Sequence, residues 1–147
     1  MGSNLGDRQS HLDFACSRLA LLLSNLRTSS FRETAPQGVD VRQPDFLNAA
    51  AVGDTALSAP ELLTALLGIE QMRGRERPHL HAPRTLDLDL ILFGDDILEQ
   101  PGLQVPHPRF RERGFVLEPL AAIAPGLRDP VTGRTVTELL VALSLGR

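Results

Sequence analysis

The chain has 147 residues, 42% of them apolar, and a formal net charge of −3. This composition predicts one globular domain, 1–147, and argues against a disordered chain or one that coats nucleic acid, since no basic tract covers it. The apolar run Leu19–Leu23 is too short to span a membrane, and a lone cysteine, Cys16, favours a reducing compartment. We therefore expect a cytoplasmic protein without a nucleic-acid or membrane partner.

The first predicted helix runs from about Arg8 to Leu26, directly after a turn-rich opening at Gly2–Gly6. Its apolar residues recur at steps of three and four, which indicates one buried face. Cys16 falls on that face, so we interpret it as a core residue rather than a nucleophile.

Two predicted strands follow, Thr28–Thr34 and Phe46–Val52, separated by a loop with prolines and a glycine at Ala35–Pro44. Phe46 and Asn48 share one face of the second strand by the period of two, which sets an aromatic ring beside an amide that both donates and accepts. Taken alone, a core phenylalanine and an edge asparagine explain this pair better than a binding site does.

A capping box at Ser58–Glu61 predicts the start of a second amphipathic helix, which ends near Arg73. The charged loop Gly74–Ala82 follows. Three arginines lie within or just after it: Arg75, Arg77 and Arg84. Their planar guanidinium groups suit a polyphosphate, although a solvated surface is the ordinary explanation for a charged loop. His79 and His81 are also compatible with a zinc site, but the lack of a nearby cysteine disfavours one.

The segment Pro83–Phe93 alternates leucine with aspartate and then runs apolar, which predicts a strand with one buried face. Asp87 and Asp89 then point the same way, with their α-carbons about 6 to 7 Å apart. At that spacing two hard cations fit between the carboxylates and bound phosphate oxygens. A strand with a solvated acidic face explains the pair equally well when it is taken alone.

A turn at Gly94–Asp96 and a return strand from Ile97 are predicted next. His107 lies between two prolines, where it either donates to a ligand or satisfies local backbone, and the sequence leaves both open. A helix is predicted at Val116–Ile123, and a capping box at Thr135–Glu138 begins the last helix.

These elements predict an α+β domain with helices packed on a mainly antiparallel sheet. Five sequence blocks in this order resemble the 6-hydroxymethyl-7,8-dihydropterin pyrophosphokinase family. The blocks are Gly2–Gly6, Phe46–Ala50, Ala82–Ile91, Val105–Phe110 and Arg113–Leu117. The resemblance implies a ferredoxin-like sandwich in which a hydrophobic strand directly precedes the first block. Because Met1 stands in its place, we expect the first strand to be missing from this chain.

The resemblance implies transfer of pyrophosphate from ATP to 6-hydroxymethyl-7,8-dihydropterin, giving AMP and the pterin diphosphate in folate biosynthesis. It also implies two Mg²⁺ ions, held by Asp87 and Asp89, and we expect a monomer. The matching pterin-binding residues are Thr34, Phe46, Asn48 and Phe115. The matching ATP-binding residues are Glu70, Arg75, Arg77, Arg84, His107 and Arg113. The expected catalytic residues are Arg75, Arg84 and Asp89. The loops 35–44 and 74–82 correspond to flaps that close over the nucleotide.

Two other hypotheses remain open. The absent first strand is compatible with a non-catalytic pterin- or nucleotide-binding protein that the truncation has made inactive. Leu80 stands where the family usually has a basic residue and His81 where many members have tryptophan, and both departures bear on loop closure and on contacts with the adenine. A different Asp-x-Asp phosphotransferase or phosphodiesterase is disfavoured, because Phe46, Asn48 and Phe115 would then have no role.

Overall fold

The computed structural model describes residues 1–35, 45–74 and 85–146, which form helices and short antiparallel strands. In chain order the elements are β1 (Gly2–Ser3), α1 (Arg8–Leu22), β2 (Ser24–Thr28), β3 (Arg32–Thr34), β4 (Phe46–Asn48), β5 (Ala51–Asp54), α2 (Ala59–Met72), β6 (Leu98–Gln100), β7 (Leu103–Val105), the 3-10 turn η1 (Phe110–Glu112), α3 (Gly114–Ile123) and α4 (Val136–Leu145). The predicted α+β class is confirmed.

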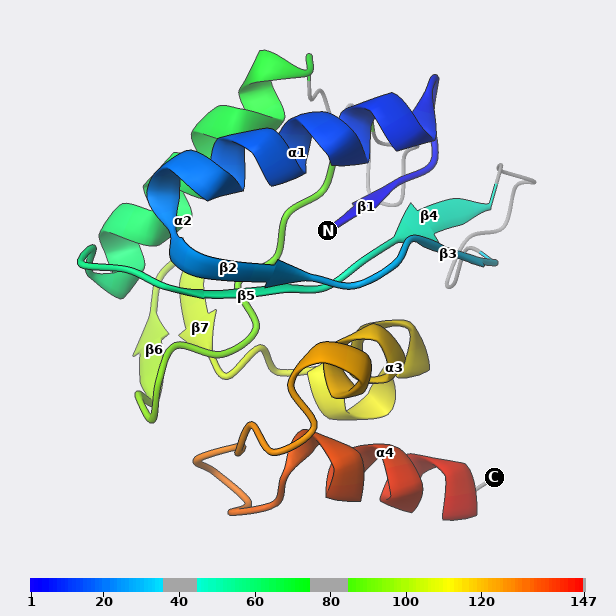
Figure 1. Ribbon diagram of the computed structural model, residues 1–147. Helices are drawn as coiled ribbons and strands as arrows, with labels where there is room; N and C mark the ends of the chain where they lie inside the picture. The colour runs from blue at the N-terminus through cyan, green and yellow to red at the C-terminus, as the bar shows by residue number, and fades with distance from the viewer. Residues whose placement is uncertain (36–44, 75–84, 147) are drawn as a thin grey trace.

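An interrupted antiparallel ribbon forms the middle of the structure (Figure 1). β2 pairs with β5, and β3 pairs with β4. Between the two pairs the Ser29 amide donates to the Ala50 carbonyl and the Ala50 amide donates to the Ser29 hydroxyl, each at 2.9 Å. β1 adds to the other edge of β4, with Gly2 opposite Asn48. β4 is therefore held on both sides.

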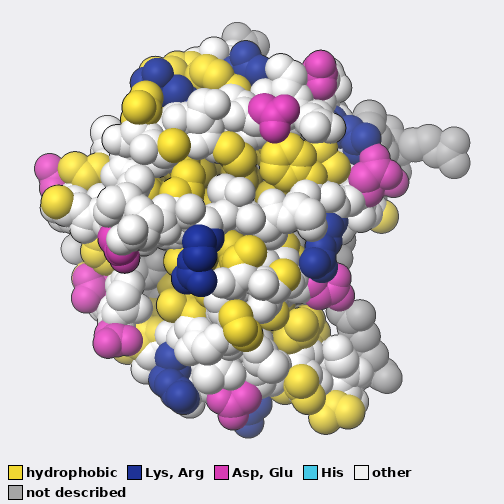
Figure 2. Space-filling model, viewed as in Figure 1, with side chains coloured by type: hydrophobic (Ala, Val, Ile, Leu, Met, Phe, Trp, Pro, Cys, Tyr) yellow, Lys and Arg dark blue, Asp and Glu magenta, His cyan; other side chains and the backbone are white. Residues whose placement is uncertain are grey.

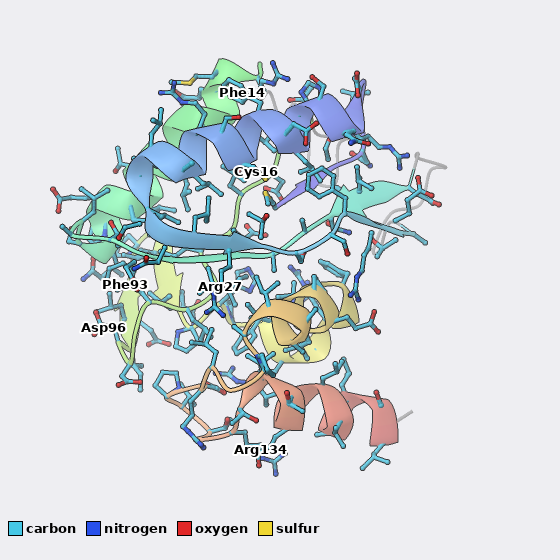
Figure 3. The ribbon with its side chains drawn as sticks, viewed as in Figure 1. Phe14, Cys16, Arg27, Phe93, Asp96 and Arg134 are labelled. Carbon is cyan, nitrogen blue, oxygen red and sulfur yellow. The ribbon has the colours of Figure 1, made fainter. Side chains whose placement is uncertain are left out.

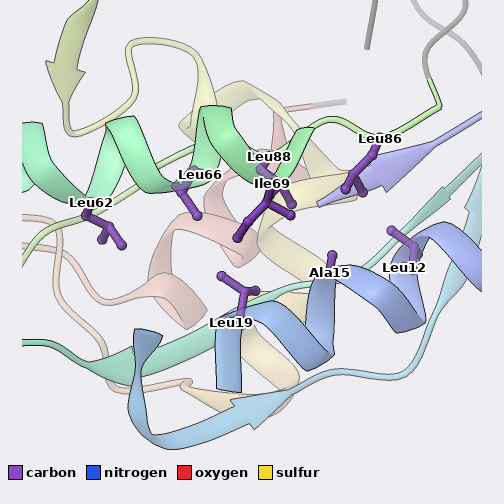
Figure 4. Packing of buried hydrophobic residues seen from close by; sticks show 8 residues of the cluster. All are labelled: Leu12, Ala15, Leu19, Leu62, Leu66, Ile69, Leu86 and Leu88. Carbon is purple, nitrogen blue, oxygen red and sulfur yellow. The ribbon is translucent and has the colours of Figure 1, made fainter. Parts of the chain in front are cut away.

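Helices α1 and α2 cover one side of the ribbon, and α3 and α4 lie on the other (Figure 1). The facing sides of α1 and α2 pack together and against the extended segment of residues 85–93 (Figure 4). The buried members of this cluster are Leu12, Ala15, Leu19, Leu62, Leu66, Ile69, Leu86 and Leu88. Burying each large side chain contributes about 1.5 to 3 kcal/mol, so the cluster fixes the aspartate-bearing segment against both helices.

A second buried cluster joins η1, α3 and α4. Its members are Phe110, Leu117, Leu120, Ala124, Val136 and Leu139. Arg27 on β2 ties this layer to the ribbon, because its guanidinium donates to the Ile123 carbonyl at 2.8 Å (Figure 3). The position of α3 beneath the ribbon is thus set by both apolar packing and a hydrogen bond across the layers.

Both predicted capping boxes are confirmed. The Ser58 and Thr135 side chains accept from the amides of Glu61 and Glu138, and each glutamate accepts in return from the backbone amide of its cap residue. α2 and α4 begin where the sequence predicts, because these signals are local to each helix start.

Three predicted boundaries are wrong. α1 ends at Leu22, earlier than predicted, because β2 begins at Ser24 and Asn25 takes the left-handed conformation with a φ of 53°. The predicted strands Thr28–Thr34 and Phe46–Val52 are each broken in two at the ribbon's interruption. These breaks depend on pairing between distant residues, which periodicity does not report.

The strand predicted at Pro83–Phe93 is also wrong for its described part. The segment is extended and Leu86 and Leu88 are buried as predicted, yet only Asp87 forms a β-bridge. Asp87 exchanges two backbone hydrogen bonds of 2.8 Å with Gly2. Because β1 has only two residues, the pairing beside it is limited to this single bridge.

The turn predicted after this segment is confirmed. Gly94 has a φ of 55°, and the Asp96 amide donates to the Phe93 carbonyl at 3.0 Å (Figure 3). A positive φ suits glycine, which lacks a Cβ. The strand that follows, β6, pairs with β7 rather than with residues 85–93.

Acidic and basic side chains are interspersed over the face shown in Figure 2. Across residues 1–35, 45–74 and 85–146, none of the helices has the length and apolar composition needed to cross a membrane.

Candidate active site

A cavity of about 690 Å³ is lined by β1, β4, β5, the segment 87–94, α3 and side chains of α1 and α2. The predicted site residues that line it are Thr34, Phe46, Asn48, Asp87, Asp89, Arg113 and Phe115. These residues come from four separate parts of the chain. The structure therefore brings together the predicted pterin-side residues and the predicted metal ligands at one cavity.

One wall consists of neighbouring strands that carry a ring and an amide. Thr34 on β3 lies opposite Phe46 on β4 in the strand register. Phe46 is half-buried, Asn48 is buried, and the Asn48 amide nitrogen donates to the Thr34 hydroxyl. The predicted sharing of one face by Phe46 and Asn48 is confirmed, since both line the cavity.

Phe115, at the start of α3, supplies a second ring. The guanidinium carbon of Arg113 lies 5.5 Å from the centre of this ring, within the range of a cation–π contact. Phe110 anchors the preceding turn because its side chain is fully buried. The buried turn therefore fixes the positions of Arg113 and Phe115, which come directly after it and line the cavity.

Asp87 and Asp89 lie on the cavity wall that the extended segment forms. The Asp89 side chain is open to the cavity, with protein around it on the other sides. This partial desolvation raises the pKa of its carboxyl, as does the charge of Asp87. His107 and Arg113 act in the opposite direction. Burial lowers the pKa of the His107 imidazole, while Asp89 opposes that shift. The two carboxylates, His107 and Arg113 thus lie within electrostatic reach of one another.

The two carboxylates fit a hard divalent cation. In the part of the chain that the structure describes, no group of three or more His, Cys, Asp and Glu side chains could hold a metal by itself. Mg²⁺ is commonly bound by one or two carboxylates together with water and substrate phosphates, so a pair is sufficient. Asp87 and Asp89 therefore suit a cation that arrives with a phosphate ligand.

His107 and Glu70 lie beside the cavity rather than on its lining. The His107 amide donates to the Ile91 carbonyl at 2.8 Å, and its Nδ1 accepts from the Arg109 amide at 3.2 Å. Glu70 is 2% exposed, and its Oε2 accepts from the Leu88 amide at 2.6 Å. Glu70 thus holds the backbone between the two aspartates, and the predicted ATP contacts of Glu70 and His107 stay predictions.

Several predictions lie outside the described residues. They are Arg75, Arg77, Arg84, His79, His81, Leu80 and all but the first residue of each predicted loop, 35–44 and 74–82. The cavity-lining residues that were not predicted to belong to the site include Gly2 and Arg109. Gly2 stood in the first sequence block and Arg109 in the fourth, so their blocks were the only signal available.

A protein-family model described as 7,8-dihydro-6-hydroxymethylpterin-pyrophosphokinase (HPPK) matches residues 1–125. The chain belongs to this family. The HPPK match covers all five sequence blocks and every residue that lines the cavity except Leu127. The resemblance drawn from the five blocks is confirmed.

Named relatives agree with the HPPK assignment. The chain is 44% identical over 142 residues to a 2-amino-4-hydroxy-6-hydroxymethyldihydropteridine pyrophosphokinase of Synechocystis, covering 95% of this chain and 72% of that protein. It is 42% identical over 144 residues to the protein of the same name from Pseudomonas aeruginosa, covering 97% and 88%. It is 38% identical over 141 residues to the folic acid synthesis protein fol1 of Schizosaccharomyces pombe, covering 95% of this chain and 19% of that longer protein.

Proposed function

We propose that the protein transfers the pyrophosphoryl group of ATP to the hydroxymethyl group of 6-hydroxymethyl-7,8-dihydropterin, with release of AMP, as a step of folate biosynthesis. The observation that carries this proposal is the single cavity that joins Phe46, Asn48 and Phe115 to Asp87 and Asp89. HPPK membership supports the same reaction. A different Asp-x-Asp enzyme would leave the rings and the amide without a role.

The pterin binds between the two half-buried rings, Phe46 and Phe115. Stacked aromatic contacts suit a flat bicyclic ring and exclude water from its faces. The buried Asn48 amide reads the amino-oxo edge, and Thr34 completes that contact. A ligand lacking this edge would leave the hydrogen-bonding positions of Asn48 that Thr34 does not use unpaired, at a cost of about 1 to 3 kcal/mol, so it is rejected.

Two Mg²⁺ ions are the proposed cofactors, with Asp87 and Asp89 as their protein ligands. When bound, magnesium neutralises phosphate charge and aligns the reacting groups. Arg113 lies on the same cavity and provides a fixed positive charge for the triphosphate. Glu70, His107, Arg75, Arg77 and Arg84 complete the proposed ATP site.

The proposed reaction exchanges one P–O bond for another. The pterin hydroxyl oxygen bonds to the β-phosphorus while the bond from that phosphorus to the bridging oxygen of the α-phosphate breaks. AMP leaves with that oxygen, and the hydroxyl proton passes to the Asp89 carboxylate. Holding the hydroxyl and the β-phosphorus in line supplies most of the acceleration, because the transfer needs positioning and charge stabilisation more than covalent catalysis. Arg75 and Arg84 are the proposed further catalytic residues.

We also propose a ferredoxin-like sandwich formed by one domain, 1–147. Support comes from α1 and α2, which pack on the same side of antiparallel strands, as that fold requires. A monomeric state and a cytoplasmic location remain predictions.

Position-labelled ATP tests the reaction. With the label on the β-phosphate we expect it in the pterin product, and with the label on the α-phosphate we expect it in AMP. Omission of Mg²⁺ should stop the transfer. Label from the γ-phosphate alone in the product, with ADP released, would replace pyrophosphoryl transfer by simple phosphoryl transfer and contradict the proposal.

A further inference from the structure

Gly2 lies against the side chain of Asn48, the residue proposed to bind the amino-oxo edge of the pterin. A Cβ placed on Gly2 would lie 2.7 Å from Asn48 Oδ1, whereas real Cβ atoms essentially never come within 3.0 Å of another atom. Its next neighbours are at ordinary contact distances, Phe46 Cδ1 at 3.6 Å and the Leu47 carbonyl oxygen at 3.7 Å. A methyl group at Gly2 would therefore displace the Asn48 amide and little else.

The Asn48 amide has little freedom to avoid that contact. Its backbone is held between β1 and β3, opposite Gly2 on one side and Arg32 on the other. Its nitrogen donates to the Thr34 hydroxyl, and the residue is only 8% exposed. Rotation away from a methyl group at Gly2 would therefore break the bond to Thr34 or turn the amide away from the cavity.

The backbone gives no separate reason for glycine at this position. Gly2 lies in a strand, and its φ is outside the left-handed region that favours glycine. Its two hydrogen bonds to Asp87 use backbone atoms that any residue but proline provides. Alanine is accordingly tolerated by the strand, and only the space taken by the Asn48 oxygen requires a residue without a Cβ.

We propose that Gly2 is a positioning residue: its missing side chain sets the orientation of the Asn48 amide and through it the affinity of the cavity for the pterin. This rests on the proposed function. Gly2 lies between the proposed pterin-binding and metal-binding residues, since it pairs with Asn48 on one side and forms a β-bridge with Asp87 on the other. Affinity for the pterin and affinity for Mg-ATP are thus expected to respond differently to a methyl group at Gly2.

The test is Gly2→Ala, with the dissociation constants for the pterin and for Mg-ATP measured separately. We expect pterin binding to weaken about 10- to 100-fold, the scale of one or two lost hydrogen bonds, with Mg-ATP binding within about twofold of wild type. Gly68→Ala is the matched control, because a Cβ at Gly68 meets nothing within 4 Å. Wild-type pterin affinity in Gly2→Ala would overturn the inference.

A double variant and a ligand-free measurement separate this inference from the proposed function. In an Asn48→Ala background the opposing oxygen is absent, so Gly2→Ala should change pterin affinity less than twofold and should fold as Asn48→Ala does; a full effect there would overturn the inference. In nitrogen-15 NMR spectra without ligand, Gly2→Ala should shift the Asn48 side-chain amide signals. Unchanged signals would refute the positioning role even if the wild-type protein failed to bind the pterin.

Discussion

Arg111 binds the carboxylate of Asp129 with two hydrogen bonds, Nε to Oδ2 at 2.6 Å and Nη2 to Oδ1 at 2.9 Å, while the Asp129 side chain is fully buried. The pair ties η1, which leads into Arg113 and Phe115, to the loop before α4. The Arg111 bond, followed by the Thr132 hydroxyl and the Val131 amide, lowers the pKa of Asp129 to about 2. Asp129 is thus an ionised group that the folded state stabilises.

Replacing Asp129 by asparagine should therefore remove stability in a pH-dependent way. A lowered folded pKa adds stability above the ordinary aspartate pKa and loses it as the pH falls towards the folded pKa. We expect Asp129→Asn to lower the free energy of unfolding by about 2 kcal/mol at pH 7. Urea unfolding between pH 7 and pH 2 measures this, with the exposed Asp95→Asn as control. A deficit that stays constant down to pH 2 would contradict the assignment.

Glu70 should act through the backbone of Leu88. In Glu70→Leu the buried Leu88 amide loses its acceptor, which costs about 1 to 3 kcal/mol and frees the backbone between Asp87 and Asp89. We expect unfolding at lower urea and at least about a tenfold loss of AMP formation in this variant. Glu70→Gln keeps an oxygen acceptor and should retain more of both stability and activity. Equal losses in the two variants would rule out this role.

The two capping boxes should contribute to stability alone. Ser58→Ala and Thr135→Ala each remove a side-chain acceptor at a helix start, which costs about 1 kcal/mol. The helices lie on opposite sides of the ribbon, so the two losses should add in the double variant. Thermal unfolding and the AMP assay at 25 °C check this together. A change in turnover greater than about twofold would show that a cap also serves the site.

Asp89 should carry a stability cost that its proposed role explains. Burial and the charge of Asp87 raise the pKa of Asp89, so ionisation of this carboxyl at neutral pH lowers the free energy of unfolding. The destabilisation disappears as the carboxyl is protonated at lower pH. We expect Asp89→Asn to unfold at a higher temperature than wild type at pH 7 without metal, with no difference near about pH 3. The same variant should not transfer pyrophosphate. A lower unfolding temperature at pH 7 would contradict the pKa shift.

The parts of the fold that depend on neighbouring residues were predictable from the sequence. α2 and α4 begin at their capping boxes, and the turn at Gly94 follows from its glycine. The end of α1 and the interruption of the ribbon were not predictable, because they depend on the conformation of Asn25 and on the hydrogen bonds between Ser29 and Ala50, which is distant in sequence.

In the candidate site, too, some features were predictable from the sequence and others depend on residues that are distant in the chain. Type and spacing made Asp87, Asp89, Phe46 and Asn48 candidates, and the family resemblance assigned them to the site; the structure places all of them on one cavity. The contribution of Gly2 was not predictable, because it lies in an atom that glycine lacks and in the position of a side chain on another strand. The burial of Glu70 against Leu88 likewise depends on how α2 packs.

The most direct test is the formation of AMP from ATP and Mg²⁺ by the 147-residue chain, with and without 6-hydroxymethyl-7,8-dihydropterin. We expect AMP formation that depends on the pterin and is absent in Asp89→Ala, while circular dichroism shows that both proteins are folded. Folded wild-type protein that forms no AMP with the pterin present, or as much without it, would contradict the account.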